Sequence, residues 1–172
     1  VAAITAANAR PLVLVNASAV GYYGVEPDGA CGEGAPQGTD FLAALCGQWE
    51  REARAADKLE VRTVMARFGV VLGQQGGALA KMLTPFKLGF GGPLGSGRQP
   101  FPWVHVDDAV GALLYAVDDA RLSGPVNVTA PETKTNAEFT KALGRALRRP
   151  AFLPAPAFAL KLALGEMSGL LL

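Results

Sequence analysis

Two continuous apolar runs constrain the fold of this chain more than any other feature. Residues 12–17 read LVLVNA, and residues 61–72 read VRTVMARFGVVL. A short apolar run without polar alternation is typical of a strand buried on both faces. Between the runs, Thr39 is placed to cap a helix whose apolar positions recur at helical spacing. Strands that alternate with helices indicate βα units and a mostly parallel sheet.

The rest of the chain continues this alternation. We expect further helices over residues 1–9, 77–87, 107–120 and 136–147, further strands over 101–106, 125–128 and 151–153, and a last helix from Pro156. Thr135 and Glu138 form a capping box that opens the helix at residues 136–147. The fold class is therefore α/β, a partial doubly wound parallel sheet with a small C-terminal α/β lobe. We place the boundary between residues 1–75 and residues 76–172, with the second part interleaved with the last strands of the sheet.

The composition of the chain excludes several classes of function. Sixteen basic and fifteen acidic residues leave a net charge of +1, which gives no electrostatic reason to expect nucleic acid or an acidic membrane surface. Cys31 and Cys46 form no CxxC motif and the chain has one histidine, so a zinc site would lack ligands and we expect no metal. No stretch reaches the roughly eighteen apolar residues of a membrane span.

The two ends of the sequence suggest a piece of a longer protein. The first residue is not methionine, and VAAITAANAR is typical of the last turns of a helix rather than of a signal peptide. The chain stops at SGLLL without a polar tail. A targeting signal upstream of residue 1 would therefore not be visible, and a cytoplasmic protein with reduced thiols is the default expectation.

Candidate site residues follow the two apolar runs. Ligands of parallel α/β sheets bind beyond the carboxyl ends of the strands, which directs attention to residues 16–18 and 67–71. Ser18 could orient a substrate oxygen, or its hydroxyl could simply cap a strand end. Tyr22 or Tyr23 could act as an acid, or could pack in a loop with the hydroxyl in water.

A second candidate region is the glycine-rich stretch at residues 88–108, LGFGGPLGSGRQPFPWVHVDD. Glycines such as Gly91 and Gly92 allow backbone N–H groups to face an anion, and Arg98 could hold a phosphate or carboxylate. The alternative is a tight turn with a solvated arginine. His105 could contribute to a substrate site, but a lone histidine on a strand is more often a structural group. Asp107 is placed to cap the following helix.

Several of these segments together resemble one known family. Residues 18–24 (SAVGYYG) and 67–73 (RFGVVLG) resemble the strand ends of extended short-chain dehydrogenase/reductases. Four further segments narrow this resemblance to one branch of that superfamily: residues 85–97, WVHVDD at 103–108, NVTAP at 127–131 and TNAEF at 135–139. They resemble an atypical branch, the NAD(P)-dependent epimerase family, or nucleoside-diphosphate-sugar epimerase-like proteins. The likeness covers nearly the whole chain.

The resemblance implies a partial Rossmann-like sheet, an NADP (or NAD) cofactor and a small polar substrate. The nicotinamide would lie near Ala17, Ser18 and residues 67–71, where Arg67, Phe68 and Gly69 approach through backbone and Val70 and Val71 form apolar walls. Substrate would contact Gly91, Gly92, Arg98 and His105. No GxGxxG or GxxGxxG opens a βαβ unit in this chain, so the turn that holds the pyrophosphate and chooses between NAD and NADP is expected upstream.

One departure from the family pattern bears on catalysis. The superfamily transfers protons with a tyrosine and a lysine four residues later, at the start of the helix that follows the serine-bearing strand. Phe41 and Leu45 stand at those two positions here. Either Ser18 with Tyr22 or Tyr23 serves instead, or the protein has lost catalysis and acts as a cofactor-binding regulatory or interaction protein. Pairing as a homodimer is left open.

Overall fold

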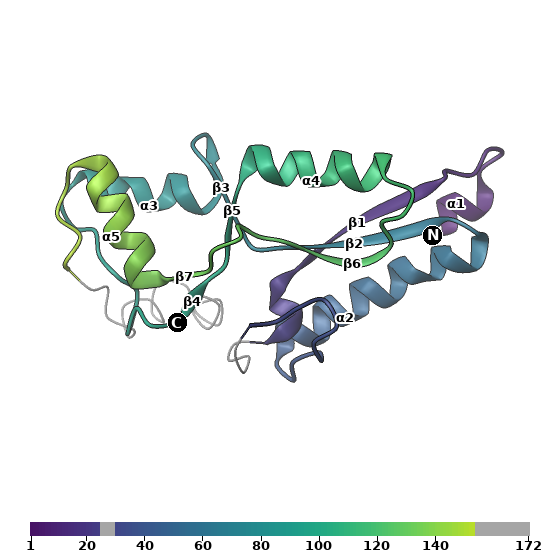
Figure 1. Ribbon diagram of the computed structural model, residues 1–172, viewed down its shortest axis with the longest axis horizontal. Helices are drawn as coiled ribbons and strands as arrows, with labels where there is room; N and C mark the ends of the chain where they lie inside the picture. Colours follow the sequence, from purple (N-terminus) through teal and green to yellow (C-terminus); the bar gives the residue numbers. More distant parts are fainter. Residues whose placement is uncertain (25–29, 154–172) are drawn as a thin grey trace. The chain divides into compact units, whose positions relative to one another are not determined.

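The computed structural model describes residues 1–24 and 30–153 (Figure 1). Its elements, in chain order, are α1 (Ala2–Ala6), β1 (Val13–Ala19), the 3-10 helix η1 (Val20–Tyr23), α2 (Phe41–Arg54), the 3-10 helix η2 (Ala55–Leu59), β2 (Arg62–Phe68), β3 (Val70–Gly73), α3 (Gly77–Lys87), β4 (Pro100–Phe101), β5 (Trp103–His105), α4 (Val106–Asp118), β6 (Gly124–Val128), β7 (Lys134–Thr135) and α5 (Asn136–Leu147). The predicted alternation of strands and helices is confirmed.

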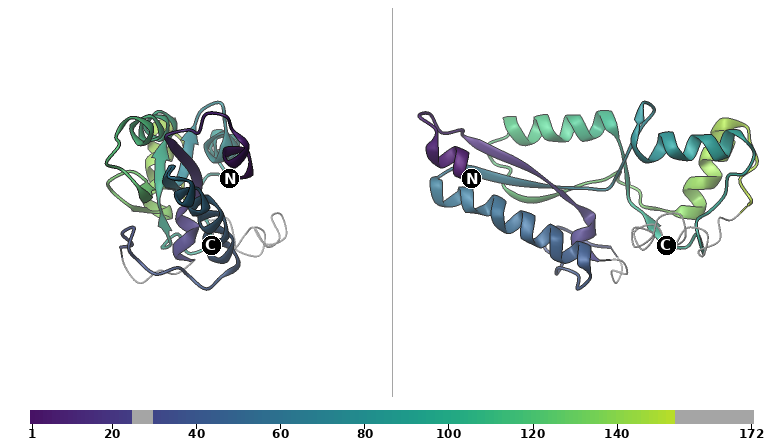
Figure 2. Two further views of the ribbon diagram at one scale, coloured as in Figure 1. Left: turned by 90° about the vertical axis from the view of Figure 1, so that its right-hand side faces the viewer. Right: turned by 180° about the vertical axis from the view of Figure 1, so that it is seen from behind.

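The largest sheet is parallel, as the two apolar runs predict. Its strand order is β1-β2-β6, and both strand pairs are parallel. Helix α4 lies along one face of this sheet and α2 along the other (Figures 1 and 2). The central strand β2 is buried from Thr63 to Arg67, because a helix covers each of its faces. This burial on both faces explains why the run at residues 61–72 lacks polar alternation.

The chain divides into two compact units. Unit 1 contains residues 1–69 and 106–129, which hold the β1-β2-β6 sheet with α2 and α4. Unit 2 contains residues 70–105 and the described chain from residue 130. It holds the parallel pair β3–β5, the antiparallel pair β4–β7, and helices α3 and α5. The first division falls at Gly69, six residues before the boundary that the sequence suggested, and residues 106–129 return to unit 1.

The first strand of the second apolar run ends within residues 67–71, where a strand end was predicted, but the chain then continues as a second strand. β2 ends at Phe68 and β3 begins at Val70, so Gly69 separates the two units. The Gly69 N–H donates to the Val128 carbonyl of β6, whereas the Val70 N–H donates to the Pro102 carbonyl. The chain thus leaves one sheet and joins another without a turn, and an apolar pattern cannot reveal such a change of pairing partner.

Two helix starts differ from the prediction by a residue or two. Asp40, not Thr39, is the N-cap of α2, and its carboxylate accepts hydrogen bonds from the Leu42 and Ala43 N–H groups. Helix α4 begins at Val106, which places Asp107 in the first turn instead of at the cap. An acid in the first turn still complements the positive end of the helix dipole.

The predictions near the carboxyl end have mixed outcomes. Helix α5 opens with the predicted capping box, in which Thr135 and Glu138 each satisfy the other's backbone N–H. Residues 151–153 do not form the predicted strand. They follow a chain reversal and carry no strand pairing. The helix predicted from Pro156 lies outside the described residues.

Candidate functional site

Three polar side chains stand in one row across the sheet of unit 1. The registers of the strands align Ser18 of β1 with Arg67 of β2, and Arg67 with Asn127 of β6. Each residue lies at or next to the carboxyl end of its strand, the edge where ligands of parallel α/β sheets bind. The sequence predicted a site at Ser18 and Arg67, and the structure adds Asn127 to the same row.

Arg67 is held by a buried ion pair with Glu50 of α2. Its Nε lies 2.7 Å from Glu50 Oε1, and its Nη2 lies 2.8 Å from Glu50 Oε2. The Ser18 hydroxyl donates to Glu50 Oε1 at 2.8 Å. Arg67, Glu50 and Ser18 are only 1%, 3% and 5% exposed. This two-pronged geometry is the strongest arrangement available to an arginine and a carboxylate.

Tyr23 joins the arginine to the third strand. Its hydroxyl donates to Asn127 Oδ1 at 2.7 Å and accepts from Arg67 Nη1 at 2.9 Å. Both hydrogen-bonding functions of the Tyr23 hydroxyl are therefore used inside the protein. The network orders the tyrosine, but it leaves the hydroxyl without a proton free for a ligand.

A loop closes over the same network. Asn127 donates from its backbone N–H to Glu33 Oε1 at 2.9 Å, and from Nδ2 to the Cys31 carbonyl at 3.1 Å. Arg67 Nη1 also donates to the Glu33 carbonyl at 3.1 Å. Residues 31–33, which the sequence indicated only as loop, are thereby fixed against the ends of β2 and β6.

Tyr22 differs from Tyr23 in what its hydroxyl does. The Arg67 guanidinium carbon lies 3.5 Å from the centre of the Tyr22 ring, a close cation–π contact. The two tyrosine rings meet edge to face with centroids 5.5 Å apart. Tyr22 is half-buried, and no residue of the described chain hydrogen-bonds its hydroxyl. Of the three predicted catalytic residues, Tyr22 is thus the one whose polar group is not committed to the network.

The charges of the network stabilise one another. Burial raises the pKa of the Glu50 carboxyl, but hydrogen bonds from Arg67 and Ser18 outweigh it, so the net pKa is lowered. Burial likewise lowers the pKa of Arg67, while its bonds to Glu50 and Tyr23 raise it above its ordinary value. The backbone hydrogen bond from Asn127 lowers the pKa of Glu33. Arg67 and Glu50 therefore remain charged near neutral pH despite their burial.

This network predicts a loss of stability in acid. A carboxyl whose folded pKa is lowered contributes stability above its unfolded pKa, about 4.3 for glutamate, and that contribution vanishes as pH falls through the folded value. We expect Glu50→Gln to lower the free energy of unfolding at pH 7 and to reduce the further loss between about pH 5 and pH 3. Urea unfolding followed by circular dichroism measures this. Glu132→Gln, at an exposed pair with Lys134, is the control and should keep the wild-type profile; a wild-type profile in Glu50→Gln would contradict the prediction.

The other predicted cofactor residues provide surface rather than charge. Ala17 is exposed at the edge of β1, and Phe68 and Gly69 are half-buried at the end of β2. Val70 and Val71 begin β3, in unit 2, and are also half-buried. The N–H groups of Gly69 and Val70 already donate to backbone carbonyls. These residues suit contact with a flat apolar ring, and none of them offers a free cation for a phosphate.

The predicted substrate residues all lie in unit 2. Gly91 and Gly92 are buried: a Cβ on Gly91 would stand 2.5 Å from the Phe86 ring, and one on Gly92 would meet the Leu153 backbone. Their lack of side chains is required by the protein's own packing. Arg98 and His105 are exposed.

Sequence reasoning missed half of the network. It assigned no site role to Glu50, Asn127 or Glu33. One signal was available, because Arg67 sits inside a strand predicted to be buried, and a buried charge requires a partner. The sequence does not say which of fifteen acids supplies it.

Phe41 and Leu45, the residues that the family resemblance implies in place of the tyrosine and lysine, both lie on α2. Phe41 opens α2 with 79% of its surface exposed, and Leu45 follows one turn later, half-buried. Within residues 1–24 and 30–153, no group of three or more acidic, histidine or cysteine side chains could hold a metal ion. None of the helices described has the length and apolarity to cross a membrane.

Comparison with known proteins agrees with this architecture. No protein-family model matches the chain. An Arabidopsis thaliana protein, "Epimerase family protein SDR39U1 homolog, chloroplastic", is 49% identical over 160 residues, covering 93% of this chain and 46% of that protein. The crystal structure of human epimerase family protein SDR39U1 with NADPH superimposes with a TM-score of 0.91 at 40% identity, covering 99% of this chain and 58% of the other. A Corynebacterium glutamicum nucleoside-diphosphate sugar epimerase gives a TM-score of 0.73 at 34% identity, covering 91% and 35%.

The parallel sheet and these matches define a Rossmann-like α/β chain of the short-chain dehydrogenase/reductase type. The chain spans about half the length of the curated relatives it matches. Within that class, its homologues over more than nine-tenths of this chain are named epimerase family proteins, as the motifs at residues 18–24 and 85–108 indicated.

Proposed function

We propose that the protein is an NAD(P)-dependent oxidoreductase or epimerase that acts on a small polar substrate, with nucleotide-sugars as the first candidates. The observation that carries this proposal is the row of Ser18, Arg67 and Asn127 at the carboxyl edge of the parallel sheet. Burying charged groups costs free energy even when they are paired, so a buried charged network suggests a functional reason for its position. This network lies at the edge of the sheet where the fold binds ligands. The NADPH in the human relative's crystal structure supports the choice of cofactor.

The residues present suit the nicotinamide end of such a cofactor. When bound, a nicotinamide supplies or accepts a hydride. Within unit 1, Ala17 and Ser18 at the end of β1 and Phe68 at the end of β2 would border its ring. Arg67 is 1% exposed and donates four of its five N–H groups to Glu50, Tyr23 and the Glu33 carbonyl, so it would act through the residues it orders and not as a phosphate ligand. The phosphates would be held by a part of the whole protein outside this chain.

Tyr22 is the residue we propose for proton transfer. Its hydroxyl has no partner in the described chain, whereas the Ser18 and Tyr23 protons are donated to Glu50 and Asn127. The Arg67 guanidinium against the Tyr22 ring supplies positive charge beside a phenol that would give up its proton. Ser18 and Tyr23 then serve to order the network. This arrangement would take over proton transfer from the superfamily's tyrosine and lysine, in whose expected positions Phe41 and Leu45 stand.

Paired phenylalanine substitutions test this division of roles in the whole protein. We expect Tyr22→Phe to leave NADPH affinity and stability near wild type and to lower turnover by about 10²–10⁴-fold, the range for a general acid. Tyr23→Phe should instead cost stability, about 1–3 kcal/mol, because Arg67 Nη1 and Asn127 Oδ1 lose a buried partner. Turnover is measured as NADPH oxidation with a panel of nucleotide-sugars and small polar carbonyl compounds. Full activity in Tyr22→Phe would exclude the assigned role.

The competing proposal is a cofactor-binding protein without catalysis. The exposed Phe41 and the committed hydroxyls of Ser18 and Tyr23 favour it, because the superfamily's usual machinery is missing. The two proposals separate in one experiment. Tight NADPH binding with no turnover of any panel member would support the regulatory alternative, and turnover that depends on Tyr22 would exclude it.

The segment that carries Arg98 remains our proposal for substrate contact. Because Gly91 and Gly92 pack against Phe86 and Leu153, Arg98 is the member of this stretch suited to an anionic substrate. The Trp103 indole N–H in the next strand is buried and has no hydrogen-bond partner in the described chain, so an acceptor on a ligand or a water would satisfy it. Unchanged binding of an anionic panel member in Arg98→Ala would contradict this placement.

Pairing with a second copy is also proposed. Phe41 and Trp49 are exposed on α2, and large exposed aromatics often mark contact surfaces. Sedimentation of the whole protein at micromolar concentration tests this, since a monomer at every concentration would contradict it.

A further inference from the structure

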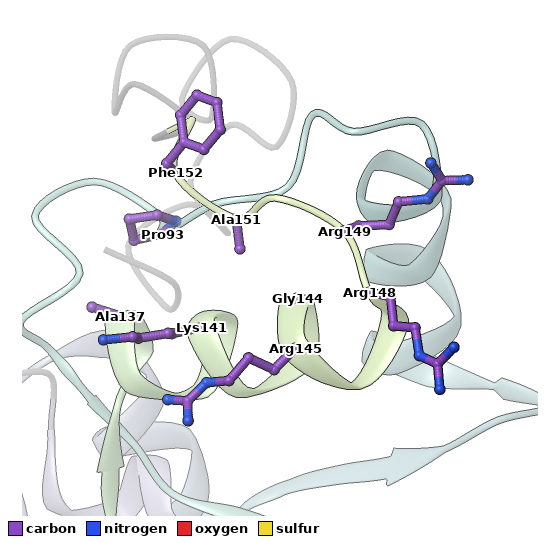
Figure 3. A pocket seen from close by; sticks show the side chains of 9 residues that line it. All are labelled: Pro93, Ala137, Lys141, Gly144, Arg145, Arg148, Arg149, Ala151 and Phe152. Carbon is purple, nitrogen blue, oxygen red and sulfur yellow. The ribbon is translucent and has the colours of Figure 1, made fainter.

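A cavity of about 490 Å³ lies beside helix α5 in unit 2, apart from the network described above (Figure 3). Small apolar side chains and Pro93 and Phe152 form its walls, and Lys141, Arg145, Arg148 and Arg149 surround it. Among residues 1–24 and 30–153, no acidic residue lines it. The volume lies in the range of small-molecule sites, which is about 300–1,000 Å³. Figure 3 shows Pro93, Ala151 and Phe152 across the cavity from α5.

A chain reversal at the end of α5 builds this cavity. Arg148 adopts the left-handed conformation with φ 52°, and the Arg149 N–H donates to the Gly144 carbonyl at 2.9 Å. A Cβ on Gly144 would stand 2.5 Å from Ala151 Cβ, so the returning chain can pass only because residue 144 is glycine. Helices usually end this way with glycine in the left-handed position. An arginine there costs conformational energy, and it adds a cation beside the cavity.

The four cations are not explained by the helix alone. Lys141, Arg145, Arg148 and Arg149 are exposed, and none makes an ion pair or hydrogen bond through its side chain within the described chain. Like charges four residues apart on a helix repel one another, as for Lys141 with Arg145 on α5. The negative end of the helix dipole stabilises cations in the last turn. It does not account for Lys141, which lies more than a turn earlier.

We propose that this cavity, hereafter the α5 pocket, binds a small organic phosphate of nucleotide size. Guanidinium groups bind phosphate oxygens in pairs, and four cations without acidic partners suit a ligand with more than one negative charge. Phe152 and Pro93 offer apolar surface to the base or another flat group of the ligand. In Figure 3 the Arg145, Arg148 and Arg149 side chains extend away from the cavity, so they would turn toward the phosphate as the ligand binds.

Calorimetric titration of the whole protein with ADP, in saturating NADPH to occupy the dinucleotide site, tests the α5 pocket. We expect ADP to bind, and the double variant Lys141→Gln/Arg145→Gln to weaken it by about 10- to 100-fold, in keeping with the loss of hydrogen bonds to a charged group. The matched control is Arg10→Gln/Lys58→Gln, which removes the same charge from exposed positions in unit 1 and should leave the affinity unchanged. Phe152→Ser should weaken ADP but not inorganic pyrophosphate.

Each other outcome overturns the proposal. Absence of ADP binding up to millimolar concentration would exclude a nucleotide-sized ligand. Equal weakening in the control variant would show a general effect of net charge. Equal affinity for ADP and pyrophosphate in the wild-type protein would exclude a role for the apolar wall. Because calorimetry measures binding and not turnover, these results do not depend on whether Tyr22 transfers protons.

Discussion

Arg67→Met is expected to lower the free energy of unfolding by about 3–5 kcal/mol, the usual cost of leaving one partner of a buried ion pair without the other. The Glu50 carboxylate would lose both of its guanidinium hydrogen bonds while remaining 3% exposed. Tyr23 and the Glu33 carbonyl would lose a donor in the same step. Urea unfolding monitored by circular dichroism gives the difference.

A second substitution separates lost charge balance from lost packing. The double variant Glu50→Leu/Arg67→Met removes both charges and should recover much of the stability, since apolar replacements of buried ion pairs are often neutral or better. Arg121→Met breaks a surface pair in which the arginine side chain is 88% and the Asp119 side chain 13% exposed, and it serves as the control, with an unfolding midpoint expected near wild type. If Arg67→Met is no worse than this control, the buried pair does not hold unit 1 together.

Gly38→Ala should be the most damaging of the small glycine substitutions in unit 1. A Cβ on Gly38 would lie 2.7 Å from the Gly24 Cα, the Gly24 nitrogen and the Tyr23 carbonyl oxygen. All three are backbone atoms, so no side-chain rotation can relieve the overlap. We expect a loss of about 1–3 kcal/mol, the range for overpacking, and a displacement of Tyr22, whose carbonyl accepts the Gly38 N–H at 2.9 Å.

The same loop provides a matched control. A Cβ on Gly34 would meet no atom within 4 Å, so Gly34→Ala should be neutral or slightly stabilising, because alanine restricts the unfolded chain. Thermal unfolding compares the two variants, and tyrosine absorbance reports the surroundings of Tyr22. Equal stability of Gly38→Ala and Gly34→Ala would mean that the loop can move away from residues 22–24 without cost.

The sequence predicted the sheet because hydrophobic pattern and secondary structure are linked locally. The run at residues 12–17 became β1, and residues 77–87 became α3 with the predicted bounds. The Thr135–Glu138 capping box is also a local motif and was confirmed. Which strands pair is a non-local property. For this reason, the pattern at residues 61–72 predicted a strand end at residues 67–71, but it did not reveal that residues 70–73 form a second strand in the other unit.

The residues of the candidate site also divide into those that local sequence patterns identify and those that depend on non-local contacts. Ser18 and Arg67 were found because they end strands, and that rule needs only the sequence. Glu50 and Asn127 were missed because they reach the network from a helix and from a strand far along the chain. Whether a hydroxyl is free or already donated, the property that distinguishes Tyr22 from Tyr23, depends on partners that no spacing pattern identifies.

The path of the chain between the two units bears on how each can form. It crosses between them after residues 69, 105 and 129, so neither unit is a single continuous segment. Closing unit 1 brings together the ends of the segment at residues 70–105, and this lowers the entropy that unit 2 must lose when it folds. Each unit thus acts on the other as a covalent cross-link would. A piece excised at residues 76–172 would retain α4 and β6 but lack β1 and β2, the other two strands of the sheet that contains β6.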